Sequence, residues 1–266
     1  TFDGLEDGDY VLVVSDNTGE LTNYQGTTPE AQSGESGVTV SGSDVTGESF
    51  GYVGLGPIGD TIWSDADGDG VQGVDETGLN DVTVNLYKGD GTFVTSTTTA
   101  DDGSGNAGYY LFEGLVPGDY YVEFEAPAGY TFTTQDATGD TGNNNPADGG
   151  TETDGGATDS DVDPDTGLTV TTTLVSGEND LSWDAGLVEL ASIGDFVWED
   201  LNADGIQDAD EVGIDGIRVE LYDCTDPTAP VFLDFTTTAN GGEYAFTGLE
   251  PGKYSVKFIA PDGSVL

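Results

Sequence analysis

The stretch Ile58-Gly-Asp-Thr-Ile-Trp63-Ser-Asp65-Ala-Asp67-Gly-Asp69-Gly70-Val71-Gln-Gly-Val-Asp-Glu76 joins an apolar run to a dense group of acidic residues. The run from Ile58 to Trp63 predicts a β-strand. From Asp65 the residues follow a calcium-loop pattern, with acids at positions 1, 3 and 5, glycine at position 6 and glutamate at position 12. The stretch therefore predicts a strand that leads directly into a calcium-binding loop.

Each position of this pattern has a physical reason. A hard cation such as Ca²⁺ takes about six to eight oxygen ligands, so a short, tightly wound loop must bring several carboxylates together. Glycine takes the sharp turn that side chains resist, and a water would complete the shell at position 9, which is Gly73. The predicted ligands are Asp65, Asp67, Asp69, Glu76 with both oxygens and, through its backbone carbonyl, Val71.

The same pattern recurs at Asp200-Leu-Asn202-Ala-Asp204-Gly205-Ile206-Gln-Asp208-Ala-Asp-Glu211. Both loops end in Asp-Glu, and both have Gln two positions after the glycine. A solvated acidic turn would explain the charge of such a stretch, but it would not explain the repeated positions of glycine and glutamate. The predicted ligands of the second loop are Asp200, Asn202, Asp204, Ile206 through its carbonyl, Asp208 and Glu211.

The charge balance of the chain is strongly acidic, with 4 Lys and Arg against 52 Asp and Glu, and a net charge of −48. Such a chain repels phosphate, which excludes nucleic acid as a partner and disfavours anionic membrane surfaces. The same repulsion would destabilise a compact fold unless cations neutralise part of it. The composition therefore points to bound metal or to a saline environment.

Several residue types that carry chemistry elsewhere are missing. The sequence has no His, and Cys224 is its only Cys, so the usual general base is absent and no intrachain disulfide can form. No run of 18 apolar residues occurs, so the sequence predicts no membrane span. These absences disfavour an enzyme and a disulfide-stapled module.

Internal repeats predict the domain organisation. Residues 58–87 align with residues 193–222 without a gap, and 14 of the 30 pairs are identical. A second signature, with Gly-Leu followed by Gly and Tyr, occurs at Gly4–Tyr10, Gly114–Tyr120 and Gly248–Tyr254. We therefore expect the C-terminal half of a repeat at 1–56, a complete repeat at 57–190, and the N-terminal half of a further repeat at 191–266.

The complete repeat reads as short strands separated by turns, without a helical stretch. The expected strands cover residues 58–63, 82–87, 93–99, 109–112, 119–125, 130–133, 168–175 and 181–187. Eight such strands predict a β-sandwich, with Phe112, Tyr120, Val122 and Phe124 in its core. We expect Trp63 and Trp198 to cap the core; the alternative for both is to stack on a carbohydrate.

The segment 135–165 differs from the rest of the repeat because it is acidic and has almost no apolar residues. Asp159, Asp161 and Asp163 alternate, so an extended chain would place them on one side. They form a weaker candidate for a further cation site. The alternative is a disordered acidic loop.

Taken together, these motifs resemble the B-type repeats of serine–aspartate-repeat adhesins, the SdrD B-like domains, which are related to the collagen-adhesin B-type (Cna-B) domains. The residues that carry the resemblance are the Ile58–Gln72 stretch, the Phe112–Tyr120 turn, Asp159–Asp161 and Asp184–Leu187. The resemblance implies all-β, tandem Greek-key or Ig-like β-sandwiches with EF-hand-like calcium loops. It also implies Ca²⁺ that stiffens the array, with ligands at Asp65, Asp67, Asp69 and Glu76, and at Asp200, Asn202, Asp204 and Glu211.

The sequence departs from the collagen-adhesin relatives in one respect. Those domains often carry a Lys–Asn isopeptide cross-link, but the strand at 59–63 has no Lys here, and Lys88 is the only basic residue in 57–190. Metal binding would therefore take the place of covalent cross-linking.

Two functions fit these observations. The first is a calcium-stabilised structural stalk or fibre segment of an extracellular microbial surface protein or adhesin. The alternative is a calcium-dependent module that binds an extracellular glycan or protein. The expected location is the cell surface or a secreted fibre. The expected partners are neighbouring repeats, joined either in one covalent array or head to tail between identical chains in a filament.

Overall fold

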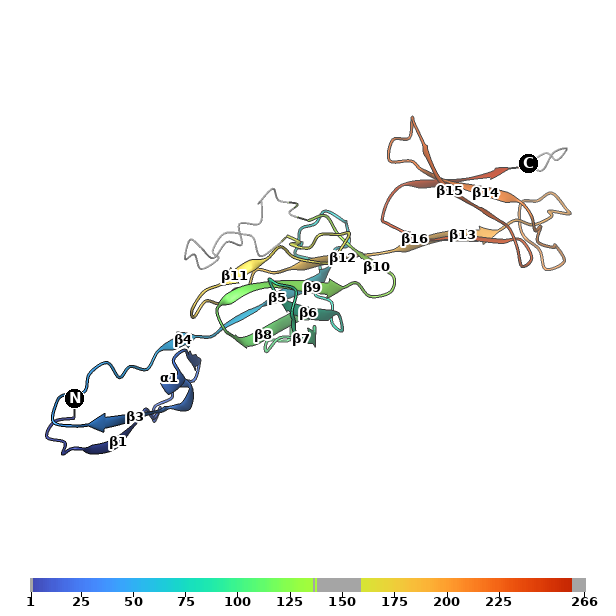
Figure 1. Ribbon diagram of the computed structural model, residues 1–266. Helices are drawn as coiled ribbons and strands as arrows, with labels where there is room; N and C mark the ends of the chain where they lie inside the picture. The colour runs from blue at the N-terminus through green and yellow to red at the C-terminus, as the bar shows by residue number, and fades with distance from the viewer. Residues whose placement is uncertain (1, 136, 138–158, 260–266) are drawn as a thin grey trace. The chain divides into compact units, whose positions relative to one another are not determined.

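The computed structural model describes residues 2–135, 137 and 159–259 (Figure 1). Contacts between residues divide the chain into two compact units. Unit 1 holds most of residues 1–187 and unit 2 most of residues 188–266, while the short segments Ala66–Gly68 and Pro127–Thr131 group with unit 2. Within the described residues, no helix combines the length and the apolar character needed to cross a bilayer.

Most of unit 1 is a sandwich of two four-stranded sheets, ordered β10-β12-β5-β8 and β11-β9-β6-β7. The strands are β5 (Gly56–Ser64), β6 (Thr83–Lys88), β7 (Phe93–Thr98), β8 (Tyr109–Leu115), β9 (Gly118–Glu125), β10 (Tyr130–Phe132), β11 (Thr172–Leu174) and β12 (Ala185–Glu189). All eight expected strands are present, and the predicted all-β sandwich is confirmed. Strand β11 is shorter than expected, because Leu168 pairs with Glu123 only through an isolated bridge, and β12 begins at Ala185 rather than at 181.

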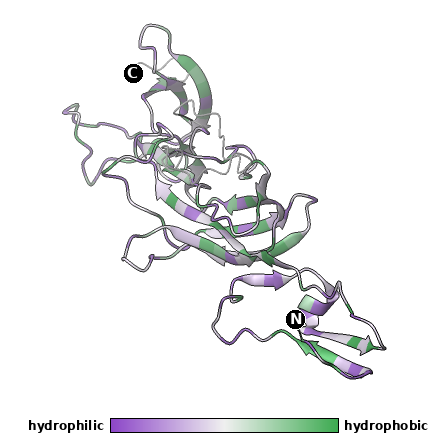
Figure 2. Cartoon of the chain, turned by 90° about the vertical axis from the view of Figure 1, so that its left-hand side faces the viewer, coloured by the Kyte–Doolittle hydropathy of each residue, from purple (hydrophilic) through white to green (hydrophobic). Residues whose placement is uncertain are grey.

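The strands form where apolar and polar residues alternate, because successive side chains of a strand point to opposite faces of the sheet. In β9, Tyr120, Val122 and Phe124 are buried, while the intervening Tyr121 and Glu123 are only partly buried. Figure 2 shows this alternation as green and purple bands along the strands. The four predicted core residues are buried, and Trp63 is 0 % exposed.

The first and last strands of the sandwich lie next to each other. Strand β12 pairs in parallel with β5, so that Ala185 faces Ile62 and Leu187 faces Ser64. Further toward the start of β5, Gly59 donates its N–H to the carbonyl of Asp180 at 3.1 Å, and Asp180 donates to the carbonyl of Pro57 at 3.1 Å. The end of the repeat therefore closes against its beginning.

Residues before the sandwich form two small antiparallel pairs and one short helix. Strand β1 (Gly8–Val13) pairs with β3 (Glu35–Val40), and β2 (Tyr24–Gly26) pairs with β4 (Tyr52–Gly54). Helix α1 (Pro29–Ser33) begins at Thr28, whose side chain accepts from Ala31 N, and it ends at Gly34, which has φ of +73°. This helix was not predicted, since its cap and turn residues are common in loops as well.

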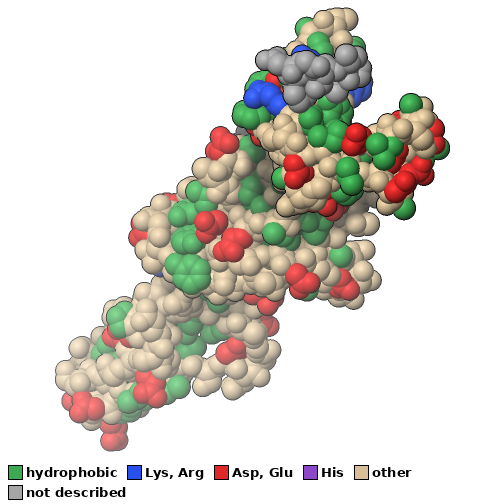
Figure 3. Space-filling view, turned by 90° about the vertical axis from the view of Figure 1, so that its right-hand side faces the viewer, with side chains coloured by type: hydrophobic (Ala, Val, Ile, Leu, Met, Phe, Trp, Pro, Cys, Tyr) green, Lys and Arg blue, Asp and Glu red, His purple; other side chains and the backbone are tan. Residues whose placement is uncertain are grey.

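The described residues 188–259 of unit 2 form the strands β13 (Ala191–Phe196), β14 (Arg218–Asp223), β15 (Val231–Thr237), β16 (Glu243–Leu249) and β17 (Tyr254–Ile259). The sheet order β15-β14-β17 matches β7-β6-β9 of the sandwich, and the pair β13-β16 matches β5-β8. Val219, Leu221 and Phe246 form its core. Figure 3 shows that acidic side chains, in red, are scattered over the surface, while Lys and Arg, in blue, gather in one area.

Candidate metal centre

The loop Asp65–Glu76 leaves strand β5 and returns beside it. Ser64 N donates to the carbonyl of Thr77 at 3.0 Å, and Trp63 forms an isolated antiparallel bridge with Gly78. A Cβ atom at Gly78 would collide with the carbonyl oxygen of Ala107, so only glycine fits there. The two ends of the loop are therefore fixed side by side.

Inside the loop, carboxylates accept hydrogen bonds from the loop's own backbone. Asp65 Oδ2 accepts from Gly70 N at 2.9 Å, and Asp69 Oδ1 accepts from Val71 N at 2.9 Å. Glu76 Oε2 accepts from Gly73 N at 2.8 Å. Gly70 has φ of +82°, a conformation that side chains resist. These bonds wind the chain so that acidic side chains turn toward the inside of the loop.

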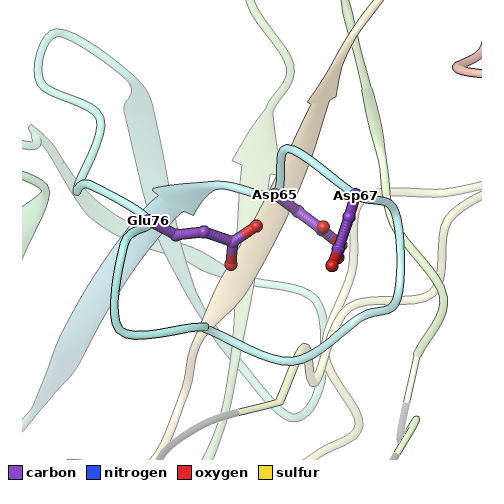
Figure 4. Close-up of side chains that lie close together, drawn as sticks. All are labelled: Asp65, Asp67 and Glu76. Carbon is purple, nitrogen blue, oxygen red and sulfur yellow. The ribbon is translucent and has the colours of Figure 1, made fainter.

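Three of the predicted ligands converge. Each of Asp65, Asp67 and Glu76 offers a carboxylate oxygen, and these three oxygens lie within 4.8 Å of one another. Figure 4 shows Glu76 extending from the returning side of the loop toward the adjacent carboxylates of Asp65 and Asp67. Asp69 and Val71 lie in the same loop but outside this cluster. Three like charges at this spacing repel one another, and a cation between them would offset that repulsion.

Neighbouring segments bury one side of the loop. Asp65 is 0 % exposed, and its Oδ2 also accepts from the Thr133 hydroxyl at 2.6 Å. Ser160 N donates to the carbonyl of Gly70 at 3.1 Å, and Val71 forms an isolated bridge with Asp159. The carboxylate at position 1 is therefore held inside the protein, where a charge without a counter-charge is costly.

Of the three residues predicted as weaker candidates for a further cation site, Asp159 and Asp161 lie close to this loop in the fold. Asp159 and Asp161 are 3 % and 4 % exposed. Asp161 Oδ2 accepts from Asp184 N at 2.7 Å, and Asp161 N donates to the carbonyl of Asp184 at 3.0 Å. Asp163 has a different role, because its Oδ1 accepts from Asp165 N at 2.9 Å and so caps a turn. The rest of the acidic segment, at 136 and 138–158, lies outside the described residues.

The second loop has the same internal hydrogen bonds as the first. Asp200 Oδ2 accepts from Gly205 N at 2.9 Å, and Asp204 Oδ1 accepts from Ile206 N at 2.8 Å. Glu211 Oε2 accepts from the backbone N–H of position 9, Asp208, at 3.0 Å. The two ends of the second loop are also joined as in the first. Glu199 N donates to the carbonyl of Val212 at 2.9 Å, and Trp198 forms an isolated antiparallel bridge with Gly213.

The side chains of the second loop converge differently. Asn202 takes the place of Asp67, and its amide donates to Asp204 Oδ2 at 3.1 Å and to Asp208 Oδ2 at 2.9 Å. Glu211 Oε1 accepts from Leu201 N at 2.7 Å. In the part of the chain that the structure describes, the tight acidic cluster occurs in the first loop alone. Asp200 is exposed, whereas its counterpart Asp65 is fully buried.

Two further acids, the buried Asp184 and the partly buried Asp60, were not predicted. Asp184 is 3 % exposed; its Oδ1 accepts from Thr61 N at 3.0 Å, and its Oδ2 has no hydrogen-bond partner. Burial, followed by the charge of Asp60, raises the pKa of Asp184 well above its usual value. Burial also raises the pKa of Asp60. The repeated Ile-Gly-Asp motif and the Asp-Ala-Gly-Leu motif were the available sequence signals for these two residues.

Comparisons with known proteins were consistent with the repeat pattern. The family model described as the SdrD B-like domain matches residues 56–187 and 191–266. Serine-aspartate repeat-containing protein F of Staphylococcus epidermidis is 34% identical over 269 residues, which cover 98% of this chain and 15% of that protein. Serine-aspartate repeat-containing protein D of Staphylococcus aureus (strain Newman) is 34% identical over 267 residues, which cover 97% of this chain and 18% of that protein.

Among solved structures, the chain aligns with BcpA, the major pilin subunit of Bacillus cereus. It aligns with a TM-score of 0.30 and 16% identity, over 79% of this chain and 61% of that one. The shaft pilin SpaA from Lactobacillus rhamnosus GG aligns with a TM-score of 0.26 and 12% identity, over 79% of this chain and 89% of that one.

Proposed function

Because the chain belongs to the SdrD B-like domain family, we propose that it is a structural stalk segment whose repeats are stabilised by calcium at the Asp65–Glu76 and Asp200–Glu211 loops. Domains of this family are structural, and the chain is not an enzyme. The observation that carries the calcium proposal is the shared conformation of the two loops, in which matching hydrogen bonds hold the acidic side chains of positions 1, 5 and 12.

The donor set of the first loop suits calcium. Its convergent side chains offer only carboxylate oxygens, which hard cations prefer, and a loop of this length gives the adaptable shell that Ca²⁺ accepts more readily than Mg²⁺. The proposed ligands of this loop are Asp65, Asp67, Asp69, Val71 and Glu76.

In the second loop we propose that Asp200, Asn202, Asp204, Ile206, Asp208 and Glu211 bind calcium. In the structure the NH₂ group of Asn202 donates hydrogen bonds to Asp204 and Asp208. On calcium binding, the amide would rotate so that its oxygen binds the ion and these hydrogen bonds are lost. The weaker candidates are Asp159 and Asp161. Their burial next to the first loop fits a further cation there, whereas Asp163 caps a turn.

Location and partners follow from the relatives as part of the same proposal. The curated relatives are serine-aspartate repeat-containing proteins of staphylococci, and the chain covers 15% to 18% of their length. We place the chain in the extracellular part of a microbial surface protein, next to further repeats. A chain of consecutive sandwiches would act as a spacer, in which each calcium ion fixes the loop at one end of a repeat.

The binding-module alternative has less support. A tryptophan exposed beside a calcium loop would favour stacking on a carbohydrate, but Trp63 is 0 % exposed and Trp198 is partly buried. Both tryptophans bridge to a glycine at the base of their loop, which is a structural role. A screen of the calcium-loaded chain against extracellular glycans and proteins tests this alternative directly, and specific binding abolished by a chelator would establish it.

The experiment that tests the proposed function is a calcium titration by isothermal titration calorimetry on chain first stripped with a chelator. We expect saturable binding at two or more sites, with magnesium binding more weakly because it prefers a small octahedral shell and keeps its waters. The double variant Glu76→Gln with Glu211→Gln is the matched control. Calcium binding that this double variant does not weaken would overturn the assignment of the loops.

A further inference from the structure

We propose that the outer face of the β15-β14-β17 sheet of one chain docks on the outer face of the β11-β9-β6-β7 sheet of a second copy. This lateral contact goes beyond the stalk function and does not rest on the calcium sites. The two faces occupy the same place in their respective repeats, since β14, β15 and β17 match β6, β7 and β9. Their charges, however, are opposite.

The first face is acidic. On β9, Glu123 and Glu125 point away from the core, facing Asn85 and Thr83 of β6. Asn85 Nδ2 donates to Glu123 Oε2 at 3.2 Å and to Glu125 Oε1 at 2.9 Å, and the Tyr87 hydroxyl donates to Glu123 Oε2 at 2.8 Å. Neutral groups therefore fix the two carboxylates, and neither belongs to an ion pair within the described residues.

The second face is basic. At the matching positions, Glu220 replaces Asn85, Lys257 replaces Glu123, and Arg218 replaces Thr83. Arg218 Nε lies 2.9 Å from Glu220 Oε1, and its Cζ lies 3.7 Å from the centre of the Phe235 ring. The Arg218 side chain is nevertheless 41 % exposed, against 15 % for Glu220, and Lys257 is exposed. The face therefore presents two cations and shields its one carboxylate.

This concentration of positive charge stands out in so acidic a chain. Three of its four basic residues, Arg218, Lys253 and Lys257, belong to unit 2. The face bearing Arg218 and Lys257 is therefore the part of the molecule that another acidic surface can approach most closely.

Aromatic rings lie beside the charges on both faces. On the acidic face, Tyr87 stacks on Tyr121 with ring centres 5.1 Å apart, and Phe93 meets the Tyr87 edge at 5.5 Å and is 54% exposed. On the basic face, Phe232 and Phe235 are 47% and 48% exposed. Burying these exposed rings against each other would supply the apolar part of a contact, as aromatic side chains do at many interfaces.

The occupant that these charges fit is another copy of the same chain. At about 0.15 M salt the Debye length is about 8 Å, so the net charge of −48 is screened between distant parts, and charges in contact decide whether two surfaces attract. Each copy carries both faces in equal number. The acidic face offers Glu123 and Glu125, and the basic face offers Arg218 and Lys257 beside its one carboxylate, Glu220, so opposite charges meet in the contact.

The test is sedimentation velocity on the full chain in calcium buffer over a range of concentrations. One variant reverses the basic face, Arg218→Glu with Lys257→Glu, and a second reverses the acidic face, Glu123→Lys with Glu125→Lys. We expect concentration-dependent self-association of the unmodified chain, weakened about tenfold or more in each variant alone, because like charges would then face each other. An equimolar mixture of the two variants should associate again, since each contact then has opposite charges.

Lys253→Glu is the matched control, because it reverses one basic side chain of the same unit that lies just before β17 rather than on the face. It should associate like the unmodified chain. Circular dichroism checks that the variants are folded. If repulsion between Glu220 and the two new glutamates unfolds the variant with the reversed basic face, Arg218→Gln with Lys257→Gln replaces it. The proposal is wrong if the unmodified chain stays monomeric throughout, if Lys253→Glu weakens association equally, or if the mixture fails to associate.

Discussion

The loops Asp65–Glu76 and Asp200–Glu211 share a sequence pattern and a set of internal hydrogen bonds, yet their surroundings differ. In the first, Thr133, Ser160 and Asp159 contact the loop, and Asp65 is buried. In the second, every residue from Asp200 to Asp210 is exposed. The twelve-residue pattern is thus sufficient to set the loop conformation, whereas segments distant in sequence decide how far its charges are removed from water.

This difference has an energetic meaning. A buried carboxylate that lacks a counter-charge costs more than an exposed one, because water no longer stabilises it. The first loop should therefore gain more from a bound cation than the second.

Calcium should raise the free energy of unfolding of both units. At a free concentration of 100 times the dissociation constant, each occupied site contributes about 2.7 kcal/mol. Differential scanning calorimetry with calcium and with excess chelator measures the change, and we expect the unit 1 transition to move further than the unit 2 transition. Identical melting curves in the two buffers would contradict calcium stabilisation, and equal shifts would contradict the proposed role of burial.

Thr133→Val should destabilise unit 1 alone. The substitution keeps the shape of the side chain but removes the 2.6 Å hydrogen bond to the buried Asp65, whose Oδ2 keeps its bond from Gly70 N. The loss of a hydrogen bond to a charged group costs about 1.5–3 kcal/mol. Chemical denaturation of the calcium-free chain measures the loss. Thr134→Val, at the exposed neighbouring position, should have little effect, and an equal loss there would show that the hydroxyl of Thr133 is not the cause.

Glu76→Gln and Glu211→Gln should each weaken one calcium site and leave the other intact. Each change removes a full charge from position 12, and we expect about tenfold weaker binding, which corresponds to about 1.4 kcal/mol. Calorimetric titration of each variant counts the sites that remain. If either single substitution abolished both sites, the two loops could not be independent.

The smallest effect concerns pH. Since burial raises the pKa of Asp184 in the folded state, the folded chain holds its proton to higher pH than the unfolded chain does. With calcium removed by a chelator, protonated Asp184 contributes its full share to the free energy of unfolding at pH values below the pKa that it has in the unfolded chain. This contribution is lost as the pH rises through the higher pKa that Asp184 has in the folded chain. Asp184→Asn should flatten this fall, and its amide oxygen can still accept from Thr61 N. Denaturation curves from about pH 4 to pH 8 compare the slopes; an unchanged slope would assign the pH dependence to other carboxyls.

Sequence patterns predicted the parts of the molecule that local chemistry controls. The alternation in β9 and the position of Gly70 specified a strand and a turn without knowledge of the rest of the fold. The burial of Asp65 could not be predicted in the same way, because it depends on Thr133 and on Ser160, which approach the loop only after the sandwich has formed. The extended pattern Asp159-Ser-Asp161-Val-Asp163 also failed to reveal that its last acid caps a turn.

The same limit applies to the buried acids Asp180 and Asp184 and to the partly buried Asp60. Asp180 accepts hydrogen bonds from the nearby Ser182 at 3.0 Å and from Thr172 of β11 at 2.9 Å, and the second partner is provided by the folded strand. In so acidic a sequence, three more Asp residues carry no signal by composition. Asp60 recurs as Asp195 in the Ile-Gly-Asp motif, but nothing in the motif predicted how far its carboxylate is buried.

The parallel pairing of β12 with β5 has a mechanical consequence. The chain enters the sandwich at the start of β5 and leaves it at the end of β12, so tension along a stalk pulls these neighbouring strands in opposite directions along their own length. Their hydrogen bonds, from Gly59–Asp180 to Asp65–Leu187, are then loaded in shear and must yield together rather than open one after another. The repeat should resist force at the strands through which force enters it, and the rate of forced unfolding should depend on this ladder.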